Sequence, residues 1–446
     1  MLLGADVVHP PTAAELHDAT ETRGLTGVCD AVLRPTSAQQ TLEAVRWCYA
    51  HDVPMTPRGG GTGFAGGAVP LAGGVIIDLG DLRAVRTLEP LLWRAHVEAG
   101  LRTAELRRLA RENGLVFPPD PGAAEQSQIG GNIATNAGGP HAFKYGVTGH
   151  WVMGLEAVIP PGELIEVGGP LRKDVAGYDL KSLLVGSEGT LGVVTAAWLK
   201  LLPAPEAAYP IMAAFPDIAS GCEAIETVLG LGLDVAAVEY LDPTTLRLAG
   251  GSLPWSRPPE SAFAVIVEVD GAEATARHNR DELLDAWAES SLSLTAPLDR
   301  REIDALWRWR DGVSLAVTTF CGGKISEDIV VPLDRLRDAI EGTLAIGAAH
   351  DLPACSWGHA GDGNLHSTFM IDPSDHGRVE RAEQAAEHLF QLAVELGGSI
   401  SGEHGLGLVK AGQLRRQWAP AAVRMHEEIK RAFDPKGLMN PGKKLA

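Results

Sequence analysis

Two histidines flank a Gly-Asp-Gly-Asn turn, and a glutamate-histidine pair follows further along the chain. His359 and His366 stand on either side of the turn, and Glu403 and His404 lie in the sequence Ser-Gly-Glu-His-Gly. Strand ends meeting at such a turn would direct both imidazoles into one pocket. Two histidines and a carboxylate can bind a divalent cation and leave positions open for a substrate. The spacing equally suits histidines that only form hydrogen bonds, so a metal centre is one of two interpretations.

Glycine-rich stretches occur at residues 57–63, 128–139 and 174–194. In the first, four glycines and Arg58 could bring several N–H groups against a phosphate, although a flexible surface turn is the alternative. Gly61–Gly66 also satisfies the Gly-x-Gly-x-x-Gly pattern of nicotinamide-binding domains. Such a site needs a helix that begins in the loop. Here more glycines, a proline and a strand-like segment follow, so the sequence argues against a Rossmann site.

The chain has 446 residues, with 38 Lys and Arg against 57 Asp and Glu, a net charge of −19. This charge repels nucleic-acid phosphates and anionic membranes, so an anionic substrate would need a local cationic pocket. The five cysteines are scattered without a Cys-x-x-Cys pair, which argues against a disulfide framework and an iron–sulfur site. No apolar run approaches about 18 residues and no signal segment is recognisable, so we expect a cytoplasmic protein without a membrane span.

A proline-rich segment at residues 203–210 predicts a boundary between two domains. Before it, we expect a helix over residues 36–51, with Ser37 as the N-cap, followed by alternating strands and helices with glycine-rich connections. After it, the order strand, helix, strand, strand, helix, strand predicts a ferredoxin-like domain. These elements are expected at 211–215, 218–231, 235–240, 263–269, 272–289 and, after an insertion, 329–333.

The order of the N-terminal motifs resembles the flavin domain of the vanillyl-alcohol oxidase/para-cresol methylhydroxylase superfamily, over residues ~28 to 205. The resemblance implies FAD. It implies noncovalent binding, because Gly61 and Thr62 stand where covalent members often carry a histidine. The implied cofactor residues are Arg58, Gly59, Gly60, Gly61, Thr62, Gly63, Pro119, Asp120, Gly130, Gly131, Asn132, Ala134, Asn136, Glu188, Gly189, Gly192, Val194 and Asn440.

The C-terminal motifs look like those of the FAD-linked D-2-hydroxyacid dehydrogenases. This group includes D-lactate dehydrogenases, the glycolate oxidase flavin subunit and D-2-hydroxyglutarate dehydrogenase. The similarity lies in residues 358–366, residues 402–405 and the ending 433–443. It implies that His359, His366 and Glu403 bind a divalent metal, most plausibly Zn²⁺, with Mn²⁺, Fe²⁺ and Co²⁺ open.

The same resemblance implies roles in binding and catalysis. Arg310 matches a substrate-carboxylate arginine, and a guanidinium pairs well with a carboxylate; a solvated helix face is the alternative. Lys324 follows in a matching place after a one-residue gap, and Ser314 stands where D-2-hydroxyglutarate enzymes have threonine. His404 would take the hydroxyl proton while hydride passes from Cα to flavin N5.

The expected fold is α+β, with three parts. Residues 1–205 form an FAD-binding domain of the para-cresol methylhydroxylase type, 206–420 a ferredoxin-like cap domain with the metal site, and 421–446 a helix and tail returning toward the flavin domain. The expected activity is oxidation of a small D-2-hydroxy acid to the 2-keto acid, with an electron acceptor or partner redox subunit and a homodimer as one possible assembly. Alternatives are a non-redox flavin transferase resembling alkyl-dihydroxyacetone-phosphate synthase and a flavin subunit within a multi-subunit oxidase.

Overall fold

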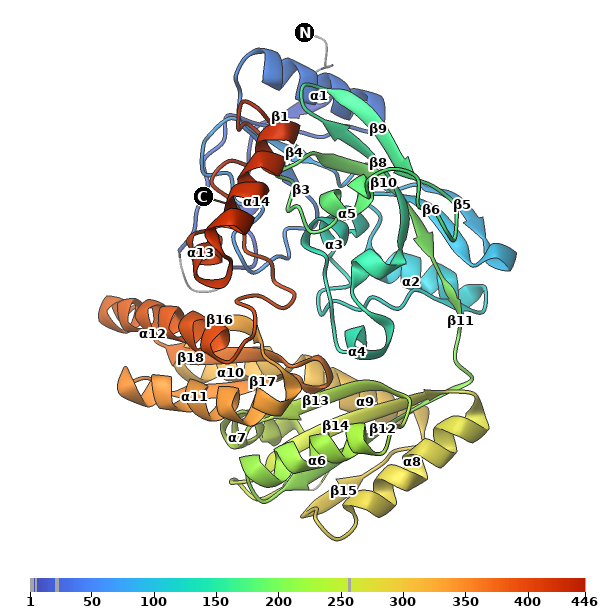
Figure 1. The fold of residues 1–446 in the computed structure, drawn as a ribbon, viewed down its shortest axis with the longest axis vertical. Coiled ribbons are helices and arrows are strands. Elements are labelled where there is room, and N and C mark those ends of the chain that lie inside the picture. The colour runs from blue at the N-terminus through green and yellow to red at the C-terminus, as the bar shows by residue number, and fades with distance from the viewer. Residues whose placement is uncertain (1–3, 5, 21–23, 256–257, 446) are drawn as a thin grey trace.

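The computed structural model describes residues 4, 6–20, 24–255 and 258–445, which form two parts stacked one above the other (Figure 1). One extended strand of chain near residue 205 joins them. Near its C-terminal end the chain leaves the second part again, and α14 (Pro420–Phe433) packs back on the first part. Among the described residues, none of the helices combines the length and apolar character that crossing a bilayer requires.

A small sheet opens the first part. Its strands are β1 (Val8–His9), β2 (Ala31–Leu33), β3 (Met55–Arg58) and β4 (Val75–Asp78). They lie in the order β1-β2-β4-β3, with β2, β4 and β3 parallel. Helix α1 (Ala38–Ala50) begins where the Ser37 hydroxyl accepts a hydrogen bond from the N–H of Gln40 at 3.2 Å. The predicted helix and its cap are therefore confirmed.

A five-stranded antiparallel sheet completes the first part, in the order β5-β6-β10-β8-β9. Its helices pack around a core that contains Leu106, Phe117 and Ile129. The strands are β5 (Val85–Glu89), β6 (Arg94–Glu98), β8 (Val152–Ile159), β9 (Glu163–Gly168) and β10 (Val193–Lys200), beside the pair β7 (Leu115–Val116) and β11 (Leu202–Pro203). The helices are α2 (Thr103–Glu112), α3 (Ile129–Thr135), α4 (Ala142–Tyr145) and α5 (Leu180–Leu184).

The second part is built on one seven-stranded antiparallel sheet, in the order β15-β12-β14-β13-β17-β18-β16. Its strands are β12 (Ala207–Phe215), β13 (Val235–Leu241), β14 (Phe263–Gly271), β15 (Ser293–Thr295), β16 (Gly323–Val330), β17 (Ala354–His359) and β18 (Asn364–Ile371). The first four strands have the ferredoxin-like order 4-1-3-2. The predicted fourth strand at 329–333 is wrong, because β15 fills that place and residues 329–330 end the opposite edge strand. β15 has three residues, too few to show alternation in the sequence.

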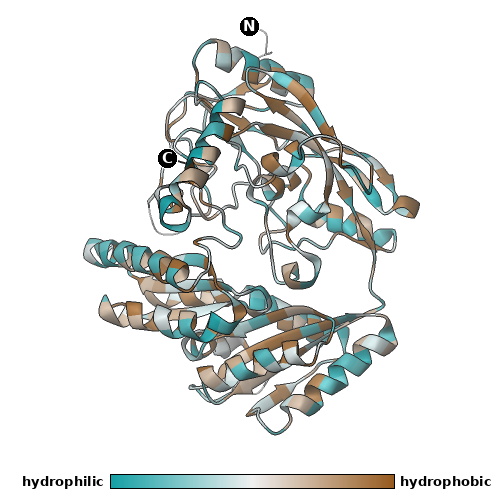
Figure 2. Ribbon diagram, in the orientation of Figure 1, coloured by the Kyte–Doolittle hydropathy of each residue, from teal (hydrophilic) through white to brown (hydrophobic). Residues whose placement is uncertain are grey.

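The two faces of this sheet differ in chemistry. Helices α6 (Ile218–Gly230), α8 (Glu273–Trp287), α11 (Leu336–Ala349) and α12 (His376–Glu395) cover one face, and α7 (Pro243–Ala249), α9 (Arg300–Asp311) and α10 (Val313–Cys321) pack on part of the other. Figure 2 shows brown, hydrophobic strands and teal, hydrophilic residues along α8 and α12. On β14, Val265 and Val267 pack in the core between the sheet and helices α6, α8, α11 and α12. Because side chains alternate along a strand, Glu268 and Asp270 point to the other face. That polar face meets the first part at α4.

The C-terminal segment returns to the first part through α13 (Leu414–Gln417) and α14 (Pro420–Phe433). Phe433 packs against the core of the five-stranded sheet. Met439 is fully buried and forms a parallel bridge with Met55 of β3. This path carries the loop with Glu403 and His404 between the two parts.

Candidate active site

His359, His366 and Glu403 converge, as the sequence predicted. One ligand atom from each lies within 4.8 Å of the others. His359 Nε2 is 3.3 Å and His366 Nε2 is 3.6 Å from Glu403 Oε1, and the two imidazole rings meet edge to face with centroids 5.2 Å apart. Both histidines are buried because they sit at the end of β17 and on β18, near the centre of the sheet.

Glu239 on β13 contacts His359 on the side away from Glu403. The sequence analysis did not identify this residue. The register pairs it with His359, and its Oε1 lies 2.6 Å from His359 Nδ1. His359 Nε2 is thereby left to face Glu403. A metal-binding histidine usually donates one ring N–H to a carboxylate, and its other ring nitrogen binds the metal. Glu239 and His359 have this arrangement, so the donor set of His359, His366 and Glu403 fits a divalent cation. A single charge in the apolar strand Val-Ala-Ala-Val-Glu-Tyr-Leu was the available signal.

The ionisation of the cluster follows from burial and mutual charge. Burial disfavours the imidazolium of His359, but the carboxylates of Glu239 and Glu403 outweigh it and raise the pKa of His359 well above its usual value. Burial and the charge of His359 lower the pKa of His366 well below its usual value. Burial opposes ionisation of Glu403, yet the neighbouring histidines lower its pKa to about 2. Glu403 is therefore an anion with imidazoles on two sides.

Asp328 on β16 anchors the loop that carries Glu403 and His404. Its Oδ2 accepts hydrogen bonds from the backbone N–H groups of Gly402 at 2.6 Å, Glu403 at 2.6 Å and His404 at 3.0 Å. The buried ammonium of Lys410 pairs with the other carboxylate oxygen. A loop without regular structure is thus fixed by one side chain of the sheet.

His404 lies between the first part and the group His359, His366 and Glu403, the candidate metal ligands, which are called the metal cluster below. Its ring is stacked on His366 with centroids 5.3 Å apart, and Phe64 lies on another side at 4.8 Å. Its Nδ1 is 3.6 Å from Asp328 Oδ1. His404 lines two cavities, which are described next.

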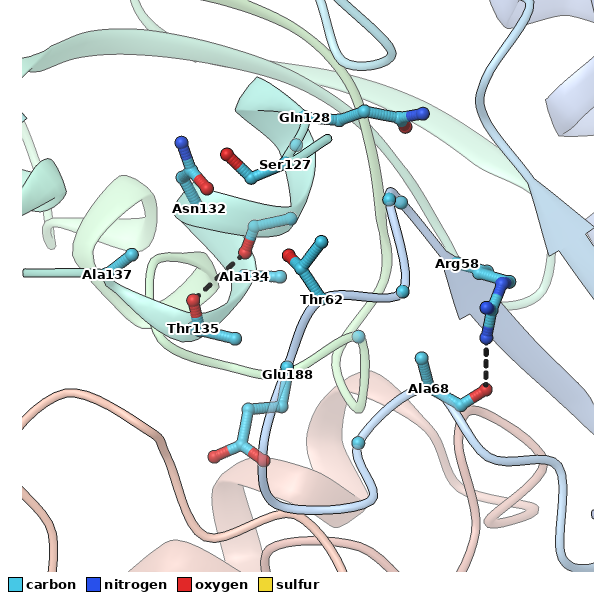
Figure 3. A pocket seen from close by; sticks show the side chains of 18 of the residues that line it. Arg58, Thr62, Ala68, Ser127, Gln128, Asn132, Ala134, Thr135, Ala137 and Glu188 are labelled. Atoms are coloured by element: carbon cyan, nitrogen blue, oxygen red, sulfur yellow. Dashed lines mark hydrogen bonds between the residues drawn. The ribbon is translucent and has the colours of Figure 1, made fainter. Parts of the chain in front are cut away.

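The first cavity runs through the N-terminal part (Figure 3). Most of the predicted cofactor residues line it, and they belong to the loop after β3, to α3 and to the turn before β10. They are Arg58, Gly59, Gly60, Gly61, Thr62, Gly63, Gly130, Gly131, Asn132, Ala134, Glu188, Gly189, Gly192 and Val194. Further lining residues that the sequence analysis did not assign include Ser127, Gln128, Thr135, Ala137 and Gly138.

Four predicted cofactor residues are not among those that line this cavity. Asp120 lines the second cavity instead. The side-chain oxygen of Asn136 accepts a hydrogen bond from the N–H of Gly149 at 2.8 Å. Asn440 donates to the carbonyls of Gly67 at 2.9 Å and of Glu188 at 2.8 Å. The two asparagines therefore fix loops around the cavity, and Pro119 is buried beside it.

Glu188 contributes to the cavity mainly through its position in the turn. Its carboxylate accepts hydrogen bonds from the N–H groups of Leu406 at 3.0 Å and Gly407 at 2.6 Å. Figure 3 shows this carboxylate directed away from Arg58, toward the C-terminal segment. Arg58 bonds the carbonyls of Ala14 at 3.0 Å and Ala68 at 3.4 Å, and burial lowers its pKa. A half-buried guanidinium beside glycine N–H groups fits a pyrophosphate.

Glycine keeps the wall of the first cavity open at Gly63 and Gly131, because a Cβ built at either position meets no atom within 4 Å. We expect Gly131→Leu to place its side chain in the cavity and weaken flavin binding by roughly tenfold or more. The flavin-to-protein absorbance ratio of the purified variant measures this. Gly230→Leu, at an equally open and exposed glycine on α6, is the control and should retain full flavin. Full flavin in Gly131→Leu would contradict the assignment of this cavity.

The second cavity lies between the two parts and has a volume of about 610 Å³. Arg310 and Lys324 line it, as do the three residues of the metal cluster. Arg310 forms an ion pair with Glu239. The ammonium of Lys324 donates to the carbonyl of Ser314 at 3.0 Å and to its hydroxyl, and lies 5.2 Å above the ring of Trp357. Glu403 and His404 line both cavities, so the cofactor space and the metal cluster meet there.

His141 joins the two parts at the wall of the second cavity. Its Nδ1 contacts the Asp120 carboxylate, and its Nε2 lies 2.8 Å from Glu268 Oε1, whose other oxygen accepts from the indole of Trp307 at 2.7 Å. Burial lowers the pKa of an imidazole, but the two carboxylates outweigh it and raise the pKa of His141 well above its usual value.

The raised pKa of His141 predicts a pH-dependent stability. A histidine whose pKa is higher in the folded than in the unfolded protein stabilises the fold. This contribution is full at pH values below the pKa of the unfolded state, about 6.5, and is lost as the pH rises through the pKa of the folded state. The unfolding temperature of the wild type should exceed that of His141→Gln by a few degrees near pH 6, and the difference should shrink at higher pH. Thermal scans of both proteins across pH check this, and a difference that grows with pH would contradict it.

Family models match both parts of the chain. The model for the C-terminal domain of FAD linked oxidases matches residues 204–444, and the FAD binding domain model matches residues 29–168. Among solved structures, 4-ethylphenol oxidase from Gulosibacter chungangensis has a TM-score of 0.81 over 99% of this chain and 95% of that chain, at 20% identity. For p-cresol methylhydroxylase the TM-score is 0.80 over 100% and 95%, at 15% identity. These structures establish the fold, as the motifs predicted.

Curated relatives are similar over nearly the whole chain. The glycolate oxidase subunit GlcD of Bacillus subtilis (strain 168) is 35% identical, over 94% of this chain and 89% of that protein. The mitochondrial D-2-hydroxyglutarate dehydrogenase of Rattus norvegicus is 32% identical over 98% and 82%, and the D-lactate dehydrogenase of Anaerostipes hadrus 30% over 93% and 89%. The chain therefore belongs to the FAD-linked oxidase family and is an FAD-dependent oxidoreductase.

Proposed function

We propose that the protein oxidises a small D-2-hydroxy acid of the lactate, glycolate or hydroxyglutarate type to the 2-keto acid. The FAD is held noncovalently in the first cavity, and a divalent cation, with Zn²⁺ favoured, is held by His359, His366 and Glu403. One observation carries the proposal: Glu403 and His404 line both the first cavity and the second cavity, which also contains His359 and His366. A substrate at the cluster would thus lie beside the cofactor.

The side chains of the second cavity divide the work between binding and proton transfer. Arg310 and Lys324 bind the substrate carboxylate in an otherwise acidic protein. His404 accepts the hydroxyl proton at Nε2, since its Nδ1 faces Asp328. The cation would lower the pKa of the substrate hydroxyl and orient it. The FAD supplies the two-electron chemistry by accepting hydride.

Two features support noncovalent FAD and a separate electron acceptor. Of the residues that line the first cavity, His404 is the one histidine, and no cysteine is among them. The cysteines at positions 29, 48, 222, 321 and 355 are free and dispersed, so they form no cluster ligand set. The acceptor is then another molecule or a partner subunit, in keeping with the word "subunit" in the name of the GlcD relatives. The cytoplasmic location and a homodimer stay predictions.

The role of His404 is tested by His404→Gln. We expect turnover to fall by roughly 100- to 10,000-fold, because the proton acceptor is lost, while flavin and metal contents stay unchanged. Steady-state kinetics and elemental analysis on the same preparation measure both. His388→Gln, at an exposed histidine of α12, is the control. Near-normal turnover of a flavin-loaded His404→Gln protein would refute the assigned role.

A further inference from the structure

The second cavity is larger than the space beside the metal cluster and His404, where the proposed reaction would take place. Its 610 Å³ falls in the range of roughly 300–1,000 Å³ that holds drug-sized ligands. The metal cluster and His404 occupy the end that borders the first cavity. The remaining wall comes from residues 116–124 and 139–145, from β14 and α9, and from Arg107 of α2.

One face of α9 runs along this cavity. Arg300, Ile303, Trp307, Arg310 and Ser314, just beyond the helix, recur at intervals of three or four and all line it. Ten residues of helix rise about 15 Å, so the wall continues for that distance from Arg310 toward the outer end. A substrate held at the metal cluster therefore has room for a tail.

Most charged side chains on this wall already have partners. Except for Asp311, the acidic groups pair with histidine, lysine or arginine, and the two cations nearest the cluster have partners as well. The pairs are Asp120 and Glu268 with His141, Asp270 with Lys144, Asp304 with Arg300, Arg310 with Glu239, and Lys324 with Ser314.

Arg107 on α2 is different. Among the described residues it has no hydrogen bond or ion pair, and its Nε is buried without an acceptor. Burial raises the pKa of Asp311; the charge of Arg310 opposes that rise, and the charge of Arg107 does so to a smaller extent. Arg107 therefore lies near Asp311 without forming an ion pair with it. A buried donor without an acceptor is costly, and in a ligand cavity it points to an acceptor that the ligand brings.

We propose that Arg107 is a specificity-determining residue that binds an anionic group at the far end of the substrate. This rests on the proposed oxidation of a 2-hydroxy acid, and it narrows the substrate class to acids with a second, distal carboxylate. Arg310 and Lys324 then bind the carboxylate next to the reacting carbon, and Arg107 binds the distal carboxylate. A guanidinium suits this role because its two N–H groups can pair with both oxygens of a carboxylate. The flavin-binding part thereby contributes to substrate choice.

The test compares two acids, D-2-hydroxyglutarate with a distal carboxylate and D-lactate without one. Anaerobic flavin reduction gives the limiting rate and the half-saturating concentration for each. In the wild type, the dicarboxylate should saturate at the lower concentration. Arg107→Gln should shift the ratio of the two half-saturating concentrations by roughly 10- to 100-fold against the dicarboxylate, and Arg107→Lys by less. Arg108→Gln, an exposed neighbour paired with Glu112, is the control and should leave the ratio unchanged.

A binding measurement makes the test independent of turnover. Calorimetric titration should show that Arg107→Gln weakens the binding of the dicarboxylate 2-oxoglutarate but not that of the monocarboxylate pyruvate. The unfolding temperature should stay unchanged, because the substitution removes no hydrogen bond or ion pair of the protein. An equal effect on both acids, no effect, or a wild-type preference for D-lactate would overturn the inference. If no 2-hydroxy acid reduces the flavin while 2-oxoglutarate still depends on Arg107, the proposed function fails and the anion site stands.

Discussion

Replacing Glu403 by glutamine is expected to abolish metal-supported turnover while the protein keeps its fold. The amide preserves size but removes the anion that lies within 3.6 Å of both histidines. Mutation of a residue that hydrogen-bonds a metal ligand typically lowers metal affinity by roughly 10- to 100-fold. Loss of a direct ligand should therefore lower metal affinity by at least about 100-fold. Metal content after dialysis and the rate of flavin reduction measure the two effects.

The control for this variant is Glu383→Gln, an exposed glutamate of α12. It should retain metal, flavin and rate. Flavin content of Glu403→Gln is expected to stay high, because Arg58 and the glycine loops that line the first cavity are untouched. A Glu403→Gln protein with full metal and full rate would show that the metal, if any, lies elsewhere.

Asp328→Asn is expected to have the largest effect on the structure. Asp328 is fully buried, pairs with Lys410 and accepts the three N–H groups of residues 402–404. Its loss leaves the buried ammonium of Lys410 with Glu327, at 3.5 Å, as the remaining counterion, and we expect a cost of about 3 kcal/mol in unfolding free energy, near the lower end for a broken buried pair. Urea unfolding of the variant, compared with exposed Asp334→Asn, measures that cost.

A double variant separates stability from positioning. Asp328→Asn with Lys410→Met removes both charges of the pair, so part of the lost stability should return, less what Glu327 loses with its 3.5 Å contact to Lys410. The loop with Glu403 and His404 still lacks the carboxylate that orders it, so metal content and turnover should stay low. Recovery of turnover together with stability would show that Asp328 acts only as the counterion of Lys410.

The residues that the sequence identified stand in short, recognisable segments. The turn with His359 and His366 joins adjacent strands, so its spacing alone placed both side chains in one pocket. The loop at residues 57–63 borders the first cavity because its glycines leave the main chain accessible. The rejection of a Rossmann helix also holds, since β4 and not a helix is the next regular element.

The residues that the sequence did not identify depend on pairing between distant strands or parts. Glu239 meets His359 through the register of β13 with β17, and Asp328 meets residues 402–404 across a long connection. Arg107 of α2 lines the same cavity as α9 because the two parts of the chain meet there. Asn440, assigned to the cofactor, instead ties two loops together. Such roles require the three-dimensional register, which spacing in the chain does not determine.

The most direct test of the account is anaerobic stopped-flow absorbance of the flavin in purified protein mixed with D-lactate, glycolate or D-2-hydroxyglutarate, with and without a chelator. We predict that at least one acid bleaches the oxidised flavin band, that chelation stops the bleaching, and that added divalent metal restores it. Bound flavin that none of these acids reduces, or reduction that is insensitive to complete metal removal, would contradict the account.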